Sequence, residues 1–581
     1  MNDIFKEIEK AEIVSFDVFD TLIMRKTLYP EDVFDIVQRK AERLGISIQD
    51  FKNLRKRADD ENPYILPTIF QIYDHLSQIG NIGQTDKETL LKLELAAEKE
   101  VLILRRSMKE ILDFAVKKGK RVHLISDMYL TREHFQEILE ELGIKGYEDI
   151  WVSCEHKESK RGGLFKTFKN EIAGETYLHI GDNLISDGES ARAAGIRTYE
   201  IKSALDILKE SAYKEILDEA ETLEDRMLIG LSISRIFNNP FLQLGEDGRP
   251  AIEDGMTLIY GFAAPLISCF MTWFVNKIKQ GEYNKILFAA RDGWMVQQLY
   301  EIYKDISRKD MPEGIYFRTS RTLCAAAAMD SEWEICQLSR REFTGEMEDM
   351  IKRRFLLDES QILPYQNCNG ITREEYALQH KEQIYQKSAQ IQKEYLEYMK
   401  KLGLRQDEKY GMFDFVSSGT SQYFLNKIVP FQIEGLYFCW YQRHDNYAKF
   451  FNQLKIDALK KDECENYETG NYFLHYLWME SIFTSFEPSI SGITQEDFVY
   501  DTESRTDDEL FYVKQMQHTV IEYFTDYLTS VVELNENQFS SKTAERLFSF
   551  IDLNFTDDRS ELFSNIHLKD DFDQNIMSVR R

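Results

Sequence analysis

Short apolar runs alternate with longer segments in which apolar residues recur at helical spacing over about the first 200 residues. The runs lie at 12–16, 121–125, 150–153, 176–180 and 198–201. Strands that alternate with amphipathic helices typically form a parallel sheet with helices on both faces. The pattern therefore predicts an α/β domain, whose ligands would bind beyond the carboxyl ends of the strands.

A second pattern of the same kind follows a helical, charged stretch and the turn-rich residues 245–250, which indicate a domain junction. Its apolar runs lie at 285–290, 314–317, 411–416 and 433–438. We therefore expect four parts. They are a first domain at 1–205, a helical linker at 206–250, a second α/β domain at 251–465, and an acidic, mostly helical C-terminal region at 466–581 that packs on the second domain.

Composition bounds the class of protein and its partners. The chain has 581 residues, of which 43% are hydrophobic and 30% charged, so we expect a globular protein with at least two domains. Lys and Arg number 72 against 100 Asp and Glu, which gives a formal net charge of −28. A charge of this sign repels nucleic acid and anionic lipid, so we expect neither as a partner.

Cysteine usage and the apolar segments indicate the compartment. The seven cysteines are scattered and never spaced as C-x-x-C, which argues against disulfides or a zinc site and for a reducing compartment. The N-terminal residues lack a basic stretch followed by an apolar one, so we expect no signal peptide. Only 256–275 approaches the length of a membrane span, and we interpret it as a buried helix. We therefore expect a cytoplasmic protein without an integral membrane segment.

A carboxylate follows the first predicted strand in the run SFDVFDTL at 15–22. Asp17 stands at the end of that strand, and the hydroxyl of Thr21 follows four residues later. A carboxylate in this position can attack phosphorus and form an aspartyl phosphate, which divides one hard displacement into two easier ones. An Asp after a strand is also a common helix cap, so this residue needs support from other motifs.

Three later motifs supply that support. Ser126 ends the second run, Lys160 stands in ESKRGGLF, and Asp182 and Asp187 stand in IGDNLISD. In order, spacing and strand context, these segments and SFDVFDTL resemble the haloacid dehalogenase (HAD) superfamily over about residues 1–205.

The resemblance implies a Rossmann-like parallel sheet with a helical cap at about 29–104, which would close over the site and choose the substrate. Asp17 would be the nucleophile, while Ser126 and Lys160 would bind the transferring phosphoryl group. Two approaching anions need a divalent cation, and Mg²⁺ is usually held by one or two carboxylates. The expected Mg²⁺ ligands are Asp17, Asp182, Asp187 and the main-chain carbonyl of Phe19.

Phe19 departs from the family pattern, in which phosphatases generally carry a second aspartate two residues after the nucleophile. That aspartate protonates the leaving alcohol and later activates water, and such acid/base catalysis is typically worth about 10²–10⁴-fold. Asp20 does not simply replace it, because neighbouring side chains of an extended segment point to opposite faces.

Three interpretations of Phe19 stay open. The site could be a dehalogenase, whose halide leaves unprotonated, although dehalogenases do not need the metal motif around Asp182. It could transfer phosphoryl groups with an acid from the cap or from the second domain. It could also be a degenerate domain that binds metal and phosphate without turnover.

The second predicted domain has its own candidate site for an anion. Small residues after a strand that contains Asp414 open a predicted helix, and backbone N–H groups at such a helix start suit an anion. Basic residues follow two other predicted strands. The candidate residues are Arg291, Asp292, Arg321, Asp414, Gly419 and Thr420. The alternative is a set of ordinary helix caps with a buried ion pair.

The whole-chain arrangement resembles a group of predicted bacterial hydrolases whose genes tend to accompany surface-polysaccharide synthesis. The resemblance implies a small phosphorylated or nucleotide-linked sugar as ligand and glycan-biosynthesis enzymes as possible partners. Our interpretation is a Mg²⁺-dependent phosphohydrolase or phosphotransferase. The alternative from another class is a non-catalytic adaptor in a glycan-assembly system.

Overall fold

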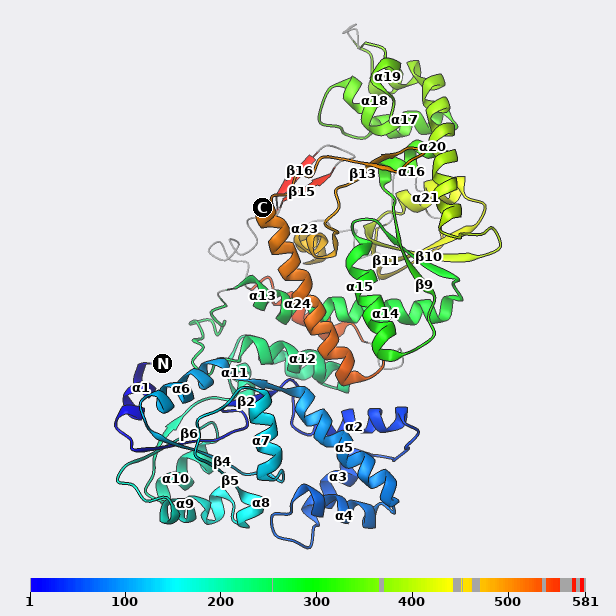
Figure 1. Cartoon of the computed structure of the whole chain (residues 1–581). Helices are drawn as coiled ribbons and strands as arrows, with labels where there is room; N and C mark the ends of the chain where they lie inside the picture. The colour runs from blue at the N-terminus through cyan, green and yellow to red at the C-terminus, as the bar shows by residue number, and fades with distance from the viewer. Residues whose placement is uncertain are drawn as a thin grey trace. The chain divides into compact units, whose positions relative to one another are not determined.

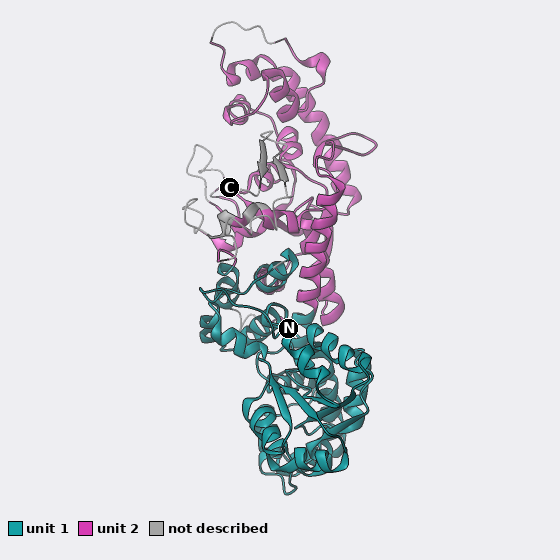
Figure 2. Ribbon diagram, turned by 90° about the vertical axis from the view of Figure 1, so that its left-hand side faces the viewer, with its two compact units in different colours: residues 1–265, 526–533, 540–550 teal, residues 266–525, 534–539, 551–581 magenta. Residues whose placement is uncertain are grey.

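The computed structural model divides the chain into two compact units (Figure 2). Unit 1 comprises Met1–Pro265, Asp526–Glu533 and Ser540–Phe550, and unit 2 comprises Leu266–Thr525, Leu534–Phe539 and Ile551–Arg581. The structure describes residues 2–252, 254–364, 370–441, 451, 453–461, 471–534, 540–553, 567–570 and 575–578.

Unit 1 contains a five-stranded sheet in the order β5-β4-β1-β6-β7, in which every neighbouring pair is parallel. The strands are β1 (Ile13–Phe16), β4 (Arg121–Ser126), β5 (Asp149–Val152), β6 (Tyr177–Gly181) and β7 (Arg197–Glu200). These are the five apolar runs of the sequence, so the predicted α/β class with a parallel sheet is confirmed.

Helices before and between these strands bury apolar side chains against the sheet. They are α1 (Asn2–Glu9), α6 (Arg106–Lys117), α7 (Arg132–Glu141), α8 (Ser153–His156), η1 (Lys160–Leu164), α9 (Phe165–Glu171), η2 (Leu184–Glu189) and α10 (Ser190–Ala193). In α9, Phe165 and Phe168 pack with Trp151 of β5 and Ile13 of β1 in one buried cluster. Burial of these side chains fixes α9 against the sheet, and with it η1, which directly precedes α9.

The insertion after β1 is helical, as the sequence predicts, and we call it the cap (Figure 1, α2 to α5). Its helices are α2 (Asp32–Arg43), α3 (Phe51–Asp60), α4 (Ile69–Ile79) and α5 (Gln84–Val101). The chain enters through β2 (Ile23–Arg25) and leaves through β3 (Leu102–Leu104), which pair antiparallel. The sequence does not reveal this ribbon, because three residues are too few for a period of two to be recognised.

Residues 206–250, expected as a linker, form part of unit 1. They contain η3 (Lys214–Glu219) and α12 (Leu223–Ile236), preceded by α11 (Ala204–Glu210). Twelve of the fourteen residues of α12 are buried, so this helix is an interior element of the unit. Whether 1–205 folds independently stays a prediction.

Unit 2 has a second parallel sheet in the order β12-β11-β10-β8-β9. The strands are β8 (Lys285–Ala289), β9 (Glu313–Phe317), β10 (Lys409–Ser417), β11 (Gln432–Trp440) and β12 (Ile456–Lys461). The chain goes from β8 to β9 on one side and returns to β10 on the other side of β8. This reversal between β8 and β10 is a point where α/β sheets commonly bind ligands.

Helices and short strands complete unit 2. Those between the strands of the sheet are α15 (Gly293–Ser307), α16 (Arg321–Ala327), α17 (Glu332–Arg340), α18 (Met347–Phe355), α19 (Arg373–Gln379), α20 (Lys381–Lys401) and α21 (Thr420–Ile428). The later elements are α23 (Asn471–Phe483), β13 (Ile490–Ile493), β14 (Phe498–Tyr500), α24 (Asp507–Val531), α25 (Lys542–Ser549), β15 (His567–Asp570) and β16 (Asn575–Ser578), of which the end of α24 and α25 belong to unit 1.

The apolar segment that approaches the length of a membrane span lies in α13 (Gly255–Leu258), η4 (Ile259–Ala263) and α14 (Ala264–Gly281). Among the residues that the structure describes, Gly255–Gly281 is the one helix with the length and composition to cross a membrane. In its most apolar window, 94% is buried inside the protein, which agrees with the interpretation as a buried helix. The described cysteines are free, and Cys368 and Cys464 lie outside the described residues.

Candidate functional site

The central strands of unit 1 bring three of the predicted residues to one edge of the sheet. Asp17 follows β1, Ser126 ends the neighbouring β4, and Asp182 follows β6 on the other side. The backbone N–H of Asp17 donates to the carbonyl of Ile180 at 2.8 Å, which extends the pairing of β1 and β6 to the carboxylate. Ser126 and Asp17 are both buried.

Lys160 reaches this edge from η1 and is buried there. Its Nζ contacts Oδ1 of Asp17 and lies 2.5 Å from Oδ1 of Asp187. Its backbone N–H donates to Oδ1 of Asp127, the residue after β4, at 2.9 Å. Two carboxylates thus compensate a cation that would otherwise be costly to bury.

Asp17, Asp182 and Asp187 form a cluster that could hold a metal ion. One ligand oxygen from each lies within 4.8 Å of the others. The hydroxyl of Thr21 donates to Asp182 at 3.2 Å, and the backbone N–H of Asn183 donates to Asp187 at 3.1 Å. Three carboxylates suit a hard divalent cation such as Mg²⁺ or Ca²⁺.

Gly181 allows the chain to place Asp182 and Asp187 so close together. A Cβ atom at position 181 would lie 2.6 Å from Cβ of Asp187, closer than two carbon atoms can approach. Only glycine therefore fits between β6 and the start of η2.

His179 of β6 completes the buried polar network. Its Nε2 lies 3.1 Å from Oδ1 of Asp187, and its Nδ1 lies 2.8 Å from Oγ of Ser15. The sequence suggests only a strand residue here. The structure shows that His179 orients one carboxylate of the cluster from behind the sheet edge, in the way that outer partners orient metal ligands.

Burial and neighbouring charges set the protonation of the cluster. Burial raises the pKa of Asp17 to about 7 and that of Asp182 to about 8, and neighbouring carboxylates add to both shifts. Burial also acts on Asp187, but Lys160 and His179 hold the pKa of Asp187 below its usual range. In the absence of a cation, Asp182 therefore retains a proton near neutral pH, and a cation would have to displace it.

This proton predicts how pH affects stability. The pKa of Asp182 rises from 3.8 to about 8 on folding, so between these values this carboxyl group binds more protons in the folded chain than in the unfolded chain. Its contribution to stability is therefore complete at low pH and is lost as pH rises toward 8. In EDTA, wild type should lose free energy of unfolding with pH more steeply than Asp182→Asn, by at most about 1.4 kcal/mol per pH unit. Urea unfolding at several pH values measures both slopes, and equal slopes would contradict the raised pKa.

Aromatic and cationic groups surround Phe19. The rings of Phe19 and Phe135 of α7 form a T-shaped pair with 5.8 Å between centroids, and the guanidinium of Arg25 lies 4.3 Å from the Phe19 ring centroid. Arg25 pairs at 2.5 Å with Glu98, a buried acid of cap helix α5 whose pKa burial raises. The acid that the cap contributes here, Glu98, pairs with Arg25, and the Arg25 guanidinium separates the Glu98 carboxylate from the Phe19 ring.

Asp20 does not lie on an extended segment, contrary to the expectation from the sequence. Its φ is 56°, in the left-handed region, and burial raises its pKa. Arg105, fully buried at the end of β3, donates to the carbonyl of Asp20 and also to those of Lys202 (3.0 Å) and Asn238 (2.9 Å). Arg105 therefore holds the backbone turn that follows the nucleophile.

Besides His179, the sequence also does not indicate Arg25, Glu98 and Arg105 as residues of this site. Their partners are distant in sequence: Arg105 and Asn238, for example, are 133 residues apart. The available sequence signal for these residues is a charged residue close to where the cap begins or ends. Such residues are too common for this signal to identify a site residue.

The predicted residues of unit 2 lie at the carboxyl ends of β8, β9 and β10. Arg291 has φ 69°, and its N–H donates to the hydroxyl of Tyr316 at 3.0 Å. Gly419, with φ 87°, and Thr420 start α21 after β10. A left-handed φ at a residue other than glycine is costly and is often found at functional positions.

Asp292 is a buried acid of unit 2 with a strongly perturbed pKa. Burial, together with the charges of Glu480 and Asp414, raises its pKa well above the usual range, while Arg291 and Arg321 oppose the shift. Burial also raises the pKa of Asp414. The fold thus places the predicted residues around the reversal between β8 and β10, and anion binding by them stays a prediction.

No protein-family model and no curated protein matches the chain. Parts of it are similar to solved structures. A putative beta-phosphoglucomutase from Thermotoga maritima is 19% identical over 32% of this chain and 84% of that chain, with a TM-score of 0.25. A HAD family enzyme from Bacteroides thetaiotaomicron is 17% identical over 33% of this chain and 94% of that chain, with a TM-score of 0.26. A haloacid dehalogenase-like family hydrolase from Xanthomonas campestris is 17% identical over 33% of this chain and 82% of that chain, with a TM-score of 0.26.

Proposed function

We propose that unit 1 is a HAD-like, Mg²⁺-dependent phosphohydrolase or phosphotransferase that acts through an aspartyl phosphate. One observation carries the proposal: the buried ammonium of Lys160 contacts Asp17 and Asp187, with Asp182 in the same cluster, at the carboxyl edge of β1. A nucleophilic carboxylate, a fixed cation and a set of metal ligands therefore stand together.

The residues have distinct parts in the reaction. An oxygen of Asp17 forms a bond to phosphorus, while the bond to the leaving oxygen breaks and that oxygen takes the electron pair. In the second step, water attacks phosphorus and releases Asp17. Lys160 and Ser126 bind the phosphoryl oxygens. Asp17, Asp182 and Asp187 would hold Mg²⁺, which supplies neutralising charge; the carbonyl of Phe19 as a further ligand is also part of the proposal.

The surroundings of Phe19 favour leaving groups that need no proton. The position two residues after the nucleophile carries an aromatic ring, and the Arg25 guanidinium lies over that ring. A guanidinium cannot act as a general acid at neutral pH, because it keeps its proton. We therefore propose activated phosphates as the best substrates. That the natural substrate is a sugar derivative of glycan synthesis rests only on the resemblance seen in the sequence.

The test is a reaction with an activated aryl phosphate in the presence of Mg²⁺. We expect a burst of aryl alcohol, stoichiometric with protein, followed by slow turnover, because water attack on the aspartyl phosphate lacks its usual base. An alkyl phosphate should react far more slowly. If Mg²⁺ binds but no burst appears, the proposal fails and the alternative of a binding or adaptor module is favoured.

A metal titration tests the ligand set separately from turnover. Asp182→Asn removes one carboxylate from a hard cation, so the affinity for Mg²⁺ should fall by at least about tenfold. Calorimetric titration measures this change. Asp206→Asn is a suitable control, because Asp206 lies on α11 and caps that helix start with Ser203. Equal Mg²⁺ affinities in wild type and Asp182→Asn would exclude this site.

A further inference from the structure

Helix α12 contacts both chain connections between the sheet and the cap. At the entry connection, a Cβ on Gly230 would lie 2.6 Å from the carbonyl carbon of Thr27, so the helix backbone packs directly on this segment. At the exit connection, the side chain of Asn238, just after α12, donates to the carbonyl of Leu104 at 3.1 Å and accepts the N–H of Arg106 at 3.2 Å. A hinge for the cap would have to lie in these two connections.

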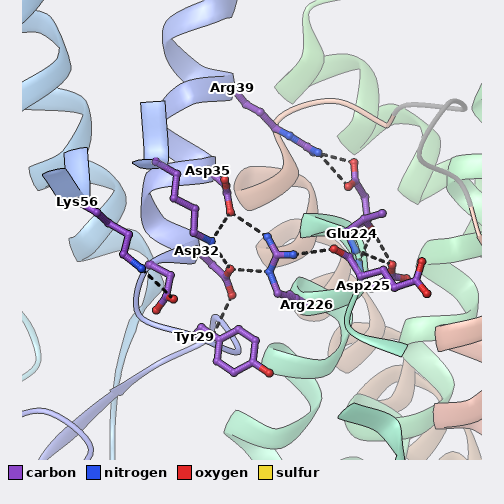
Figure 3. Close-up of polar contacts among 12 residues, drawn as sticks. Tyr29, Asp32, Asp35, Arg39, Lys56, Glu224, Asp225 and Arg226 are labelled. Atoms are coloured by element: carbon purple, nitrogen blue, oxygen red, sulfur yellow. Dashed lines mark hydrogen bonds and ion pairs between the residues drawn. The ribbon is translucent and has the colours of Figure 1, made fainter. Parts of the chain in front are cut away.

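The same helix is also bonded to the first cap helix (Figure 3). From α12, Arg226 donates to Asp32 at 2.6 Å and to Asp35 at 2.9 Å, both in α2. Arg39 of α2 forms two parallel hydrogen bonds, of 2.7 and 2.9 Å, with the buried carboxylate of Glu224. Charge-assisted, bidentate pairs of this kind fix orientation as well as distance.

A second element of unit 1 supports the entry connection. Lys26, beside Thr27, lies 2.7 Å from Asp526 near the end of α24. Arg39 also donates to the carbonyl of Val531 at 3.1 Å. The connection is therefore held from two sides, and the first cap helix is bonded to both.

Rotation of the cap about these connections would break several partly buried ion pairs together. Asp32 is fully buried, and although burial raises its pKa, Arg226 opposes that shift. Separation from Arg226 would leave a buried acid with weaker compensation, which is costly. This cost opposes the opening motion by which caps and lids commonly admit substrate.

We infer that α12 braces the cap in one position relative to the sheet that carries Asp17, and that Arg226 is the positioning residue of this brace. The inference rests on the proposed function only where it concerns catalysis. If the cap selects the substrate, a loosened cap should weaken substrate binding, while the nucleophile Asp17 stays in place. The brace itself is a property of the fold and can be measured without turnover.

Arg226→Gln tests the brace without leaving the acids uncompensated. Lys52 of cap helix α3 lies 2.9 Å from Asp35 and 3.5 Å from Asp32, so a cation remains beside both. Because Lys52 belongs to the cap, it neutralises the acids but cannot bond them to α12. We therefore expect the variant to fold and to lose the two Arg226 bonds to α2, which leaves the Arg39–Glu224 pair as a side-chain bond between α2 and α12.

Hydrogen exchange of the full-length protein gives the decisive measurement. In Arg226→Gln, exchange of α2 and of residues 26–28 should rise about tenfold or more, while β1 and β6 keep their protection. Gly230→Ala should act on the same segments, since its added methyl group displaces the entry connection. Arg192→Gln is the matched control, because Arg192 forms an exposed pair with Glu200 in the same unit. Unchanged exchange in α2 would overturn the inference, as would an equal rise in β1 and β6.

The kinetic readout distinguishes the brace from the proposed function. KM for an alkyl or sugar phosphate should rise about tenfold in Arg226→Gln, while the burst amplitude with a small aryl phosphate stays unchanged. Arg226→Lys should recover part of the KM change. If wild type has no phosphoryl-transfer activity, the proposed function fails while the exchange experiment still decides the brace. A burst amplitude lost together with the KM change would contradict a positioning role for Arg226.

Discussion

Asp17→Asn should abolish the burst of aryl alcohol, lowering the rate of its formation by at least about a thousandfold. An amide is a poor nucleophile toward phosphorus, and the substitution also removes one carboxylate from the contact with Lys160. The measurement is rapid-mixing kinetics with an aryl phosphate at saturating Mg²⁺. Mass spectrometry of acid-quenched protein should find one added phosphoryl group in wild type and none in the variant.

Two control variants make this result specific to the nucleophile. Asp17→Glu keeps the charge but moves the oxygens by one methylene, so it should also lack the burst. Asp113→Asn, on the exposed face of α6, should retain it fully. A normal burst in Asp17→Asn at saturating Mg²⁺ would show that another residue attacks phosphorus.

Lys160→Met should destabilise the cation-free protein by about 3–5 kcal/mol, because removing one partner of a buried ion pair leaves the other charge uncompensated. The Lys160 side chain is only 3% exposed, and it contacts two carboxylates whose own side chains are almost as buried. The free energy of unfolding in EDTA, from urea denaturation of wild type and variant, measures the loss. Added Mg²⁺ should restore part of it, since a cation in the cluster replaces the missing positive charge.

Lys166→Met is the matched control, since Lys166 lies on the exposed side of α9 in the same segment. Surface substitutions usually change stability by less than about 0.5 kcal/mol, so this variant should resemble wild type. Equal stability of Lys160→Met and Lys166→Met would mean that the charges around Asp17 are compensated by other groups.

The strands of both sheets could largely be predicted from the sequence, because buried parallel strands produce continuous apolar runs. The position of α12 could not. Its apolar residues occur on all sides of the helix together with Glu224, Asp225 and Arg226, so a charged connecting helix was the natural interpretation. A helix that is apolar all round is usually buried, and 227–236 has this pattern, but the charged residues at 224–226 obscure it.

The candidate site, too, could be predicted only in part from the sequence. Asp17 and Asp182 follow predicted strands and Ser126 ends one, and the carboxyl ends of parallel strands lie at one edge of a sheet, so their convergence was predictable. The contact of Arg25 with both Phe19 and Glu98 was not, since it depends on how the cap packs on the sheet. Pairings between residues far apart in sequence leave no local pattern.

The pairing of Lys26 with Asp526 has a consequence for biosynthesis. The two residues are 500 positions apart, although both belong to unit 1. At about 5–20 residues per second, a ribosome would need roughly 25–100 s to synthesise the intervening chain. The sheet of unit 1 can form early, but the support of its cap connection from α24 has to wait for nearly the whole chain. During that interval the nascent cap lacks one of its two supports, so truncated or stalled chains would expose a cap that is less firmly held than in the finished protein.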